Sequence, residues 1–195
     1  LWDWMQTNKK LIKHCKRGSR KAQFKLYERF ASTLLGISLR YCRNKEDAED
    51  VLQEAFIDIF KNIGNLEKES SLFPWMKSIV VHKAISHYSA QKKYVNNVSF
   101  KPVSLQDEKQ VEDLIEKSGY EELLEMIHSL PAGYRTVFNL HAIEGYKHRE
   151  IAEMLKISEG TSKSQYSRAR QMMVEKLKKN HEKEKVQIEL ITKSG

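Results

Sequence analysis

Apolar side chains recur at steps of three and four along much of the chain, which is the spacing of one face of an α-helix. The first such stripe predicts a helix over residues 21–41 and consists of Phe24, Tyr27, Phe30, Leu34, Ile37 and Tyr41. A second helix is predicted to follow Asn44, a good N-cap, and to run to about Phe60. Pro74 fits the first turn of a third helix, which contains Trp75 as an expected core anchor. These helices predict an N-terminal bundle.

The pattern changes after residue 94, where Asn, Ser, Pro and charged side chains alternate without a period. This composition predicts a linker with a short helix near 111–117, followed by a second cluster of helices over 120–130, 131–140, 147–156 and 158–179. We therefore predict an all-α fold of two small helical domains joined by a flexible linker. The predicted parts are an N-terminal domain at 1–94, a linker at 95–119, a helix-turn-helix domain at 120–180 and a charged, frayed tail at 181–195.

Composition adds a partner class to this picture. The 195 residues carry a net charge of +8, which favours a polyanionic partner, with nucleic acid ahead of an anionic membrane surface. The charge is uneven: residues 1–25 have eight basic side chains and one acidic, whereas residues 46–58 have six acidic and none basic. No apolar stretch or leader pattern indicates a membrane span or secretion, so a cytoplasmic location is expected. The two cysteines have no metal-ligand spacing and are expected to be reduced thiols.

Residues 148–173 have the pattern of a helix-turn-helix. Ile151 and Leu155 give the first helix an inward face, Ser158 can cap the second, and Ala169 and Met173 face inward. Polar and basic residues fill the rest of the second helix, where they can reach base edges and phosphates. The candidate duplex-binding residues are Arg149, Ser158, Thr161, Ser162, Lys163, Ser164, Gln165, Arg168 and Arg170. The alternative is an ordinary pair of core helices with a solvated polar face.

Carboxylates follow one face of the second helix at steps of three, four and four. Asp47, Asp50, Glu54 and Asp58 form this row, with Gln53 beside it. A carboxylate row repels DNA and suits a basic protein surface, although a merely solvated face is the common meaning of such a run.

The third helix and the loop before it have the opposite character. The loop offers small polar groups, and the helix has lysines and aromatic rings without an acid, a combination that can hold unstacked bases and their backbone. The candidate residues are Asn62, Asn65, Ser70, Ser71, Lys77, His82, Lys83, Ser86, Lys92 and Lys93. On composition alone the lysines are equally well explained as solvated side chains.

In their order along the chain these pieces resemble the sigma factors of the extracytoplasmic-function (ECF) group, the compact type with only the second and fourth conserved sigma domains. The core-polymerase-binding helix of that group resembles DAEDVLQEAF, and its −10-reading helix resembles FPWMKSIVVHKAISHY. Its −35-reading domain resembles LPAGYRTVFNLHAIEGYKHREIAEMLKISEGTSKSQYSRAR. The similarity covers about residues 10–180 apart from the linker.

The resemblance implies a sigma factor that binds core RNA polymerase, recognises −35 and −10 promoter elements and stabilises melted DNA. It implies that the polymerase-binding residues are Asp47, Asp50, Gln53, Glu54, Phe56 and Asp58, and that residues 62–71 capture a flipped base. The linker would thread toward the polymerase active site, and an anti-sigma factor, typically membrane-tethered, would control the protein. No catalytic residue, cofactor or small-molecule substrate is implied.

Two positions depart from the family pattern. His82 and Ser86 stand where the −10 helix commonly has Asn and Asp, so base preferences are not transferred. Thr161–Ser162–Lys163 replaces the common Thr-Val-Lys, a mild change.

Two other classes of protein remain as alternatives. A dimeric helix-turn-helix regulator would explain residues 120–180 but would leave the acidic row without a role. A metal-dependent hydrolase would need ligand spacing that the seven histidines do not show.

Overall fold

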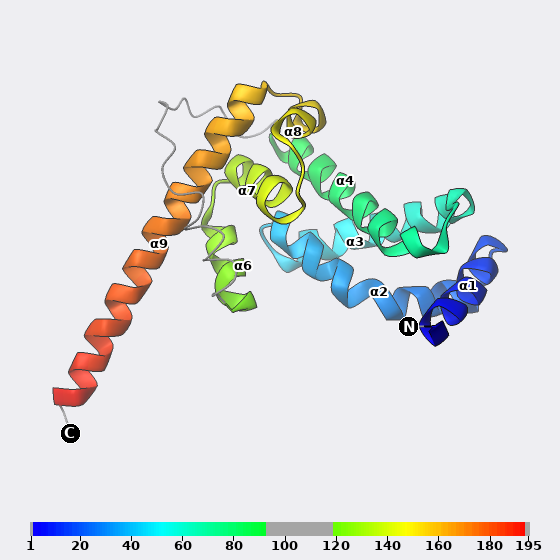
Figure 1. Cartoon of the computed structure of the whole chain (residues 1–195), viewed down its shortest axis with the longest axis horizontal. Helices are drawn as coiled ribbons and strands as arrows, with labels where there is room; N and C mark the ends of the chain where they lie inside the picture. The colour runs from blue at the N-terminus through cyan, green and yellow to red at the C-terminus, as the bar shows by residue number, and fades with distance from the viewer. Residues whose placement is uncertain (1, 93–118, 194–195) are drawn as a thin grey trace. The chain divides into compact units, whose positions relative to one another are not determined.

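The computed structural model describes residues 2–92 and 119–193, and all regular structure in these two ranges is helical (Figure 1). The chain divides into two compact units, Leu1–Asn96 and Asn97–Gly195. The all-α fold in two helical domains is therefore confirmed. The predicted linker, its short helix and Lys93 fall on residues outside the described ranges, apart from Gly119.

The N-terminal unit is built on three long helices that pack against one another: α2 (Arg20–Tyr41), α3 (Lys45–Asn62) and α4 (Leu72–Lys92). The shorter α1 (Trp2–Lys16) packs on α2 and on two 3₁₀ turns, η1 (Ile63–Asn65) and η2 (Glu69–Ser71), which connect α3 to α4 (Figure 1). The predicted N-cap of α3 is present, because the Asn44 side chain accepts a hydrogen bond of 2.7 Å from the backbone N–H of Asp47. This cap fixes where the acidic helix begins.

The buried stripe of α2 differs from the predicted one at its N-terminal end. Phe24 is 60% exposed and Tyr27 40% exposed, whereas Ala22 and Leu26 are buried. The steps of three from Phe24 to Tyr27 to Phe30 mimic a helix face, but successive steps of four from Ala22 lead to the same Phe30. Packing against α1 and α3 selected the second register, so two aromatic rings remain on the surface.

The C-terminal unit packs four helices around a small core. These are α6 (Tyr120–Ser129), α7 (Ala132–Phe138), α8 (His148–Leu155) and α9 (Glu159–Lys193), with a π-helical turn, η3 (Asn139–Ile143), after α7. The core cluster consists of Met126, Ile127, Leu130, Tyr134, Phe138, Ala169, Met173 and Leu177. The inward faces predicted for Ala169 and Met173 are thus confirmed.

The turn between α8 and α9 has the expected helix-turn-helix geometry. Lys156 adopts the left-handed conformation with φ 53°, and the backbone N–H of Ile157 donates to the carbonyl oxygen of Ala152 at 3.1 Å. The predicted cap is present, since Ser158 Oγ accepts a hydrogen bond of 2.9 Å from the backbone N–H of Thr161. This arrangement ends one helix and starts the next within three residues.

The predicted frayed tail is wrong over most of its length, because α9 continues as one helix to Lys193. The sequence contains neither glycine nor proline from Thr161 to Lys193, so nothing in the backbone chemistry breaks the helix there.

Candidate functional site

The acidic face of α3 is divided between solvent and the neighbouring helix. Asp50, Gln53 and Glu54 are exposed, whereas Asp47 and Asp58 are half-buried toward α4. The regular spacing of these residues therefore places them on one side of the helix, but only Asp50, Gln53 and Glu54 are fully exposed to solvent.

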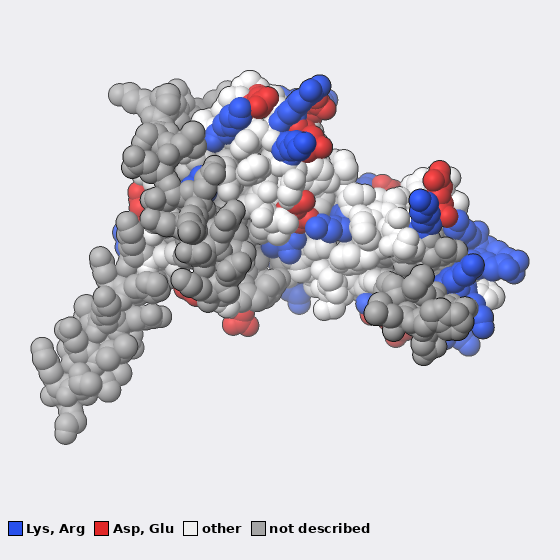
Figure 2. Space-filling model, viewed as in Figure 1, with Lys and Arg blue, Asp and Glu red and all other residues white. Residues whose placement is uncertain are grey.

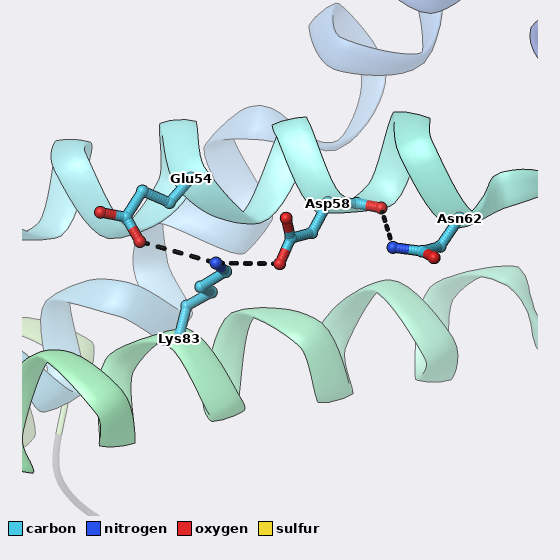
Figure 3. Close-up of polar contacts among 4 residues, drawn as sticks. All are labelled: Glu54, Asp58, Asn62 and Lys83. Carbon is cyan, nitrogen blue, oxygen red and sulfur yellow. Dashed lines mark hydrogen bonds and ion pairs between the residues drawn. The ribbon is translucent and has the colours of Figure 1, made fainter.

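Lys83 of α4 joins the two helices. Its Nζ atom lies 2.8 Å from Asp58 Oδ2 and 3.6 Å from Glu54 Oε2 (Figure 3). The hydrogen bond from Lys83 holds the pKa of the Asp58 carboxyl below its ordinary value, and the same bond raises the pKa of Lys83. A second contact joins His87 Nε2 to Asp47 Oδ2 at 3.6 Å. Lys83, which was predicted to bind DNA, is thus paired with Asp58 and Glu54, which were predicted to bind polymerase.

Phe56, predicted to bind polymerase, lies in the core and is only 4% exposed. Its ring centroid lies 4.8 Å from that of Tyr27 and 5.7 Å from that of Phe60. Because the side chain faces inward, Phe56 packs in the core between α2 and α3 and offers no surface to a partner.

The acidic face of α3 also carries apolar surface, at a residue that the sequence analysis missed. Ile57 is 52% exposed, and it follows Gln53 by four residues and Glu54 by three, so it shares their side of α3. This helical spacing from Gln53 and Glu54 could have indicated Ile57 from the sequence alone. Phe24 and Tyr27 add exposed aromatic surface on the neighbouring α2.

A cleft of about 490 Å³ opens where the end of α3 and the η1 turn meet α4. It is lined by Asp58, Asn62, Asn65, Trp75, Ile79, His82, Lys83 and Ser86. Five of the ten residues predicted to bind −10 DNA are therefore brought together in one cavity. Trp75 is half-buried in its wall, so the expectation of a core anchor was wrong. An indole beside amides and a lysine gives this cleft both a stacking surface and hydrogen-bonding groups.

Internal hydrogen bonds hold the cleft in shape. Asn62 Nδ2 donates to the backbone oxygen of Asp58 at 2.9 Å (Figure 3), and His82 Nδ1 lies 2.7 Å from the backbone oxygen of Ser78. Lys16 of α1 donates from Nζ to the backbone oxygen of Leu66 at 2.6 Å, which ties α1 to the loop. That contact joins residues fifty positions apart, and no local pattern could have indicated it.

Three further predicted −10 residues with described side chains are not part of the cleft lining. Ser70 and Ser71 are exposed at η2, and Lys77 is half-buried on α4. Lys92 is the last described residue of α4, and its side chain lies outside the description.

The start of α9 presents the predicted recognition surface. Lys163 and Ser164 are exposed, and Gln165 and Arg168 are half-exposed on the same helix. Lys163 Nζ lies 2.6 Å from Glu159 Oε1, an exposed pair that lowers the pKa of the glutamate, chiefly through its hydrogen bond. On α8, the exposed Arg149 lies 3.5 Å from Glu153.

Ser158 has the capping role that the sequence predicted, whereas Ser162 and Arg170 have structural roles that the sequence analysis did not assign to them. The hydroxyl of Ser158 caps α9, so it is engaged within the chain. Ser162 is fully buried, with Oγ 2.9 Å from His148 Nδ1, and Arg170 is 5% exposed with its guanidinium 5.5 Å from the Tyr166 ring centre. The predictions that Ser162 and Arg170 face DNA are thus corrected, because α9 packs against α6, α7 and α8 along this side.

Two histidines connect the helices of this motif. His141 and His148 stack with ring centroids 4.1 Å apart, and the edge of Tyr166 meets His141 at 4.5 Å. His141 Nδ1 lies 2.8 Å from the backbone oxygen of Tyr146. This ring cluster fixes the start of α8 against α9.

The described ranges show no group of three or more His, Cys, Asp or Glu side chains that could hold a metal ion. Cys15 and Cys42 are both buried free thiols, and burial raises the pKa of Cys15 to about 11. No helix in the described part of the chain is long and apolar enough to cross a membrane.

A helical bundle with an acidic helix face and a polar cleft, followed by a helix-turn-helix unit, is the arrangement of a DNA-binding protein. Comparison with known proteins gives the family. Residues 26–94 match the family description "Sigma-70 region 2", and residues 120–173 match "Sigma-70, region 4". The chain belongs to the sigma-70 family.

Its relatives define the group within that family. It is 28% identical over 181 residues to the ECF RNA polymerase sigma-E factor of Haemophilus influenzae, covering 88% of this chain and 95% of that protein. It is 24% identical over 180 residues to the RNA polymerase sigma-H factor of Pseudomonas aeruginosa, covering 85% and 91%. The protein is thus an ECF-type sigma factor, a transcription initiation factor.

The structure of the sigma factor RpoE in complex with the anti-sigma factor NepR from Bartonella quintana has a TM-score of 0.48 at 18% identity. It covers 79% of this chain and 95% of that chain.

Proposed function

We propose that the three surfaces divide the work of initiation between them. The solvent-facing part of α3 binds core polymerase, the cleft beside α4 takes an unstacked −10 base, and the start of α9 reads the −35 duplex. The observation that carries this assignment is the cleft, since it joins residues of the η1 turn to residues of α4 in one polar cavity with an indole wall.

The docking surface on α3 combines charge with apolar area. Asp50, Gln53 and Glu54 are exposed on the same side of α3 as Ile57, whose side chain is 52% exposed. Interfaces gain affinity from such a desolvated anchor, while the surrounding charges select a basic partner and exclude DNA. An acidic rim around an isoleucine thus fits a basic protein surface of polymerase.

The cleft can hold a base without any catalytic group. Trp75 offers a face for stacking, Asn62 and Asn65 offer amides, and His82 and Ser86 offer further hydrogen-bonding groups. A base held there cannot return to the duplex, so binding energy stabilises melted DNA. On this basis the chain acts as a binding factor and not as an enzyme.

The start of α9 contributes the duplex contacts. Lys163, Ser164, Gln165 and Arg168 remain accessible, so the readout is assigned to these four together with Thr161. Gln165 can pair with a base edge, and the cations can contact phosphates.

The same surfaces also offer a means of regulation. An anti-sigma factor that covers Ile57 and the neighbouring exposed rings Phe24 and Tyr27 would block polymerase binding. A membrane-tethered form of that factor stays a prediction. The protein would act in the cytoplasm, where polymerase and promoter DNA are found.

A run-off transcription assay tests the proposal directly. The purified chain is mixed with sigma-free core polymerase and a pool of genomic promoter fragments. Discrete start sites that need the chain are expected, and variants Ile57→Glu and Trp75→Ala should separate the two N-terminal surfaces. Ile57→Glu should lose co-sedimentation with core polymerase, whereas Trp75→Ala should keep it and lose open complexes.

The same assay tests the rival dimeric regulator. Tight binding of the chain alone to a palindromic duplex, without co-sedimentation with core polymerase, would replace the proposal by that regulator.

A further inference from the structure

Two side chains of the cleft beside α4 donate hydrogen bonds to the backbone of their own helices. Asn62 donates from Nδ2 to the backbone oxygen of Asp58 at 2.9 Å. His82 Nδ1 lies 2.7 Å from the backbone oxygen of Ser78, and because a carbonyl oxygen can only accept, the hydrogen of this contact belongs to Nδ1. Each bond reaches back to a carbonyl group four residues earlier in the chain.

The other end of each of these side chains is a hydrogen-bond acceptor. A neutral imidazole carries a hydrogen on only one nitrogen, so with Nδ1 as the donor, Nε2 of His82 accepts. The oxygen of the Asn62 amide lies at the opposite side from its bond to Asp58 and accepts as well (Figure 3). Both side chains are exposed and both line the cleft. The cleft therefore has an acceptor from α3 and an acceptor from α4.

The single lysine among the lining residues is also engaged within the protein. Lys83 Nζ lies 2.8 Å from Asp58 Oδ2 and 3.6 Å from Glu54 Oε2 (Figure 3). Lysine and arginine side chains gather on another part of the N-terminal unit (Figure 2, right). Because the carboxylates offset the attraction of Lys83 for an anion, the cleft suits an uncharged base better than a phosphate.

A cleft with such acceptors distinguishes bases by the group in which adenine and cytosine differ from guanine and thymine. Adenine and cytosine have an amino group that donates, whereas guanine and thymine have a keto oxygen that accepts. A keto oxygen placed against His82 Nε2 would leave two acceptors facing each other without a hydrogen between them, which is unfavourable for both. The indole of Trp75 can stack on any base and adds no preference.

We propose that the cleft selects an amino base, adenine or cytosine, and that His82 is the residue that determines this specificity. His82 accepts from the amino group through Nε2, and Asn62 assists through its amide oxygen. His82 stands where the ECF group commonly has Asn, whose amide can offer either a donor or an acceptor, so the single polarity is a feature of this chain. The inference rests on the proposed role of the cleft as the site of an unstacked −10 base.

The test sequences the templates on which core polymerase, reconstituted with the full chain, starts transcription. The library is a promoter identified by the run-off assay, with its −10 region randomised, and the reaction is run at pH 8, where imidazole rings are mostly neutral. With the wild-type chain, one position of the non-template strand should be enriched in adenine and cytosine roughly fivefold over guanine and thymine. This is the factor expected for about one hydrogen bond.

Two substitutions change the polarity of the group at His82. In His82→Gln the amide can offer either polarity, so the preference should fall close to one. In His82→Lys the ammonium group only donates, so the preference should turn toward guanine and thymine. The matched control is Ser89→Lys, which adds the same charge two turns further along α4, at an exposed residue outside the cleft lining, and should keep the wild-type preference.

An unchanged preference in both His82 variants would overturn the proposal, as would a wild-type preference for keto bases at the position that these variants affect. An equal change in Ser89→Lys would mean a general effect of charge and would overturn it too. Circular dichroism of all three variants should match the wild type, because both substituted residues are exposed.

Trp75→Ala separates this inference from the proposed function. If Trp75→Ala loses open complexes while the His82 variants keep the wild-type preference, the cleft binds a base but His82 does not select it. If Trp75→Ala starts transcription as the wild type does, the assignment of the cleft is itself wrong, and the inference fails with it.

Discussion

The two units place predicted contact residues on their helices in different ways. In the N-terminal unit, α3 packs against α2 and α4 and keeps one side open, so that Asp50 and Gln53 remain accessible. In the C-terminal unit, α9 packs against α6, α7 and α8, and Ser162 and Arg170 are buried between them. A polar residue on a helix is therefore a safer surface prediction where the helix has few neighbours than where it is the central helix of its unit.

The ion pairs of the two units also differ, in whether they join separate helices or lie within one helix. Lys83 pairs with Asp58 and Glu54 across two helices, whereas Lys163 pairs with Glu159 one turn away on the same helix. The first pair joins two predicted binding surfaces, and the second is local. Each unit can thus be tested by its own substitutions.

The largest effect is expected from Phe138→Ala, which tests whether the units fold independently. Phe138 is fully buried, so the C-terminal unit should lose about 3–5 kcal/mol of unfolding free energy. Denaturation is followed by circular dichroism and by tryptophan fluorescence, because Trp2, Trp4 and Trp75 all belong to the N-terminal unit. An early transition should appear in circular dichroism alone; a matching shift in fluorescence would show that the units are coupled.

The next effect concerns the open side of α3. Asp50→Lys/Glu54→Lys should weaken binding to core polymerase by at least about 100-fold, since like charges opposed across an interface cost several kcal/mol. Affinity is measured with labelled core polymerase by titration. The control Glu28→Lys/Glu125→Lys makes the same change in charge at exposed acids elsewhere, and its affinity should remain within a few-fold of the wild type.

A smaller pair of effects separates buried from accessible residues on α9. Gln165→Ala should leave stability unchanged and reduce discrimination between −35 sequences by about 1–3 kcal/mol. Ser162→Ala should instead destabilise the unit by about 1–3 kcal/mol, because the substitution removes the buried contact between the Ser162 hydroxyl and His148 Nδ1. Competition gel-shift assays and thermal unfolding distinguish the two, and a specific loss of sequence preference in Ser162→Ala would contradict its buried role.

The smallest effect is the titration of Asp58. The hydrogen bond from Lys83 lowers the pKa of Asp58, so the contribution of this pair to stability is complete above the ordinary value of 3.8 and is lost as the pH falls through the lowered pKa. Lys83→Met should return the Asp58 pKa toward 3.8, as followed by NMR of the side-chain carboxyl. Glu159, lowered mainly by Lys163, serves as the internal control and should titrate unchanged.

Much of this architecture is determined by the sequence itself. Asn44 and Ser158 have side chains that accept a backbone hydrogen bond at a helix start, and both caps were predicted and confirmed. The stripes that bury Val51, Ile59 and Met173 follow from helix periodicity alone. The order of three motifs was sufficient to indicate an ECF-type sigma factor.

Tertiary structure decided what local patterns leave open. The choice between two registers on α2, which exposes Phe24 and buries Leu26, depends on which helices pack beside it. The burial of Ser162 has the same origin, because periodicity gives the side of a helix but not the neighbours that cover it. The cleft and the Lys83 pair both need side chains from separate helices, and only packing brings these within reach of one another.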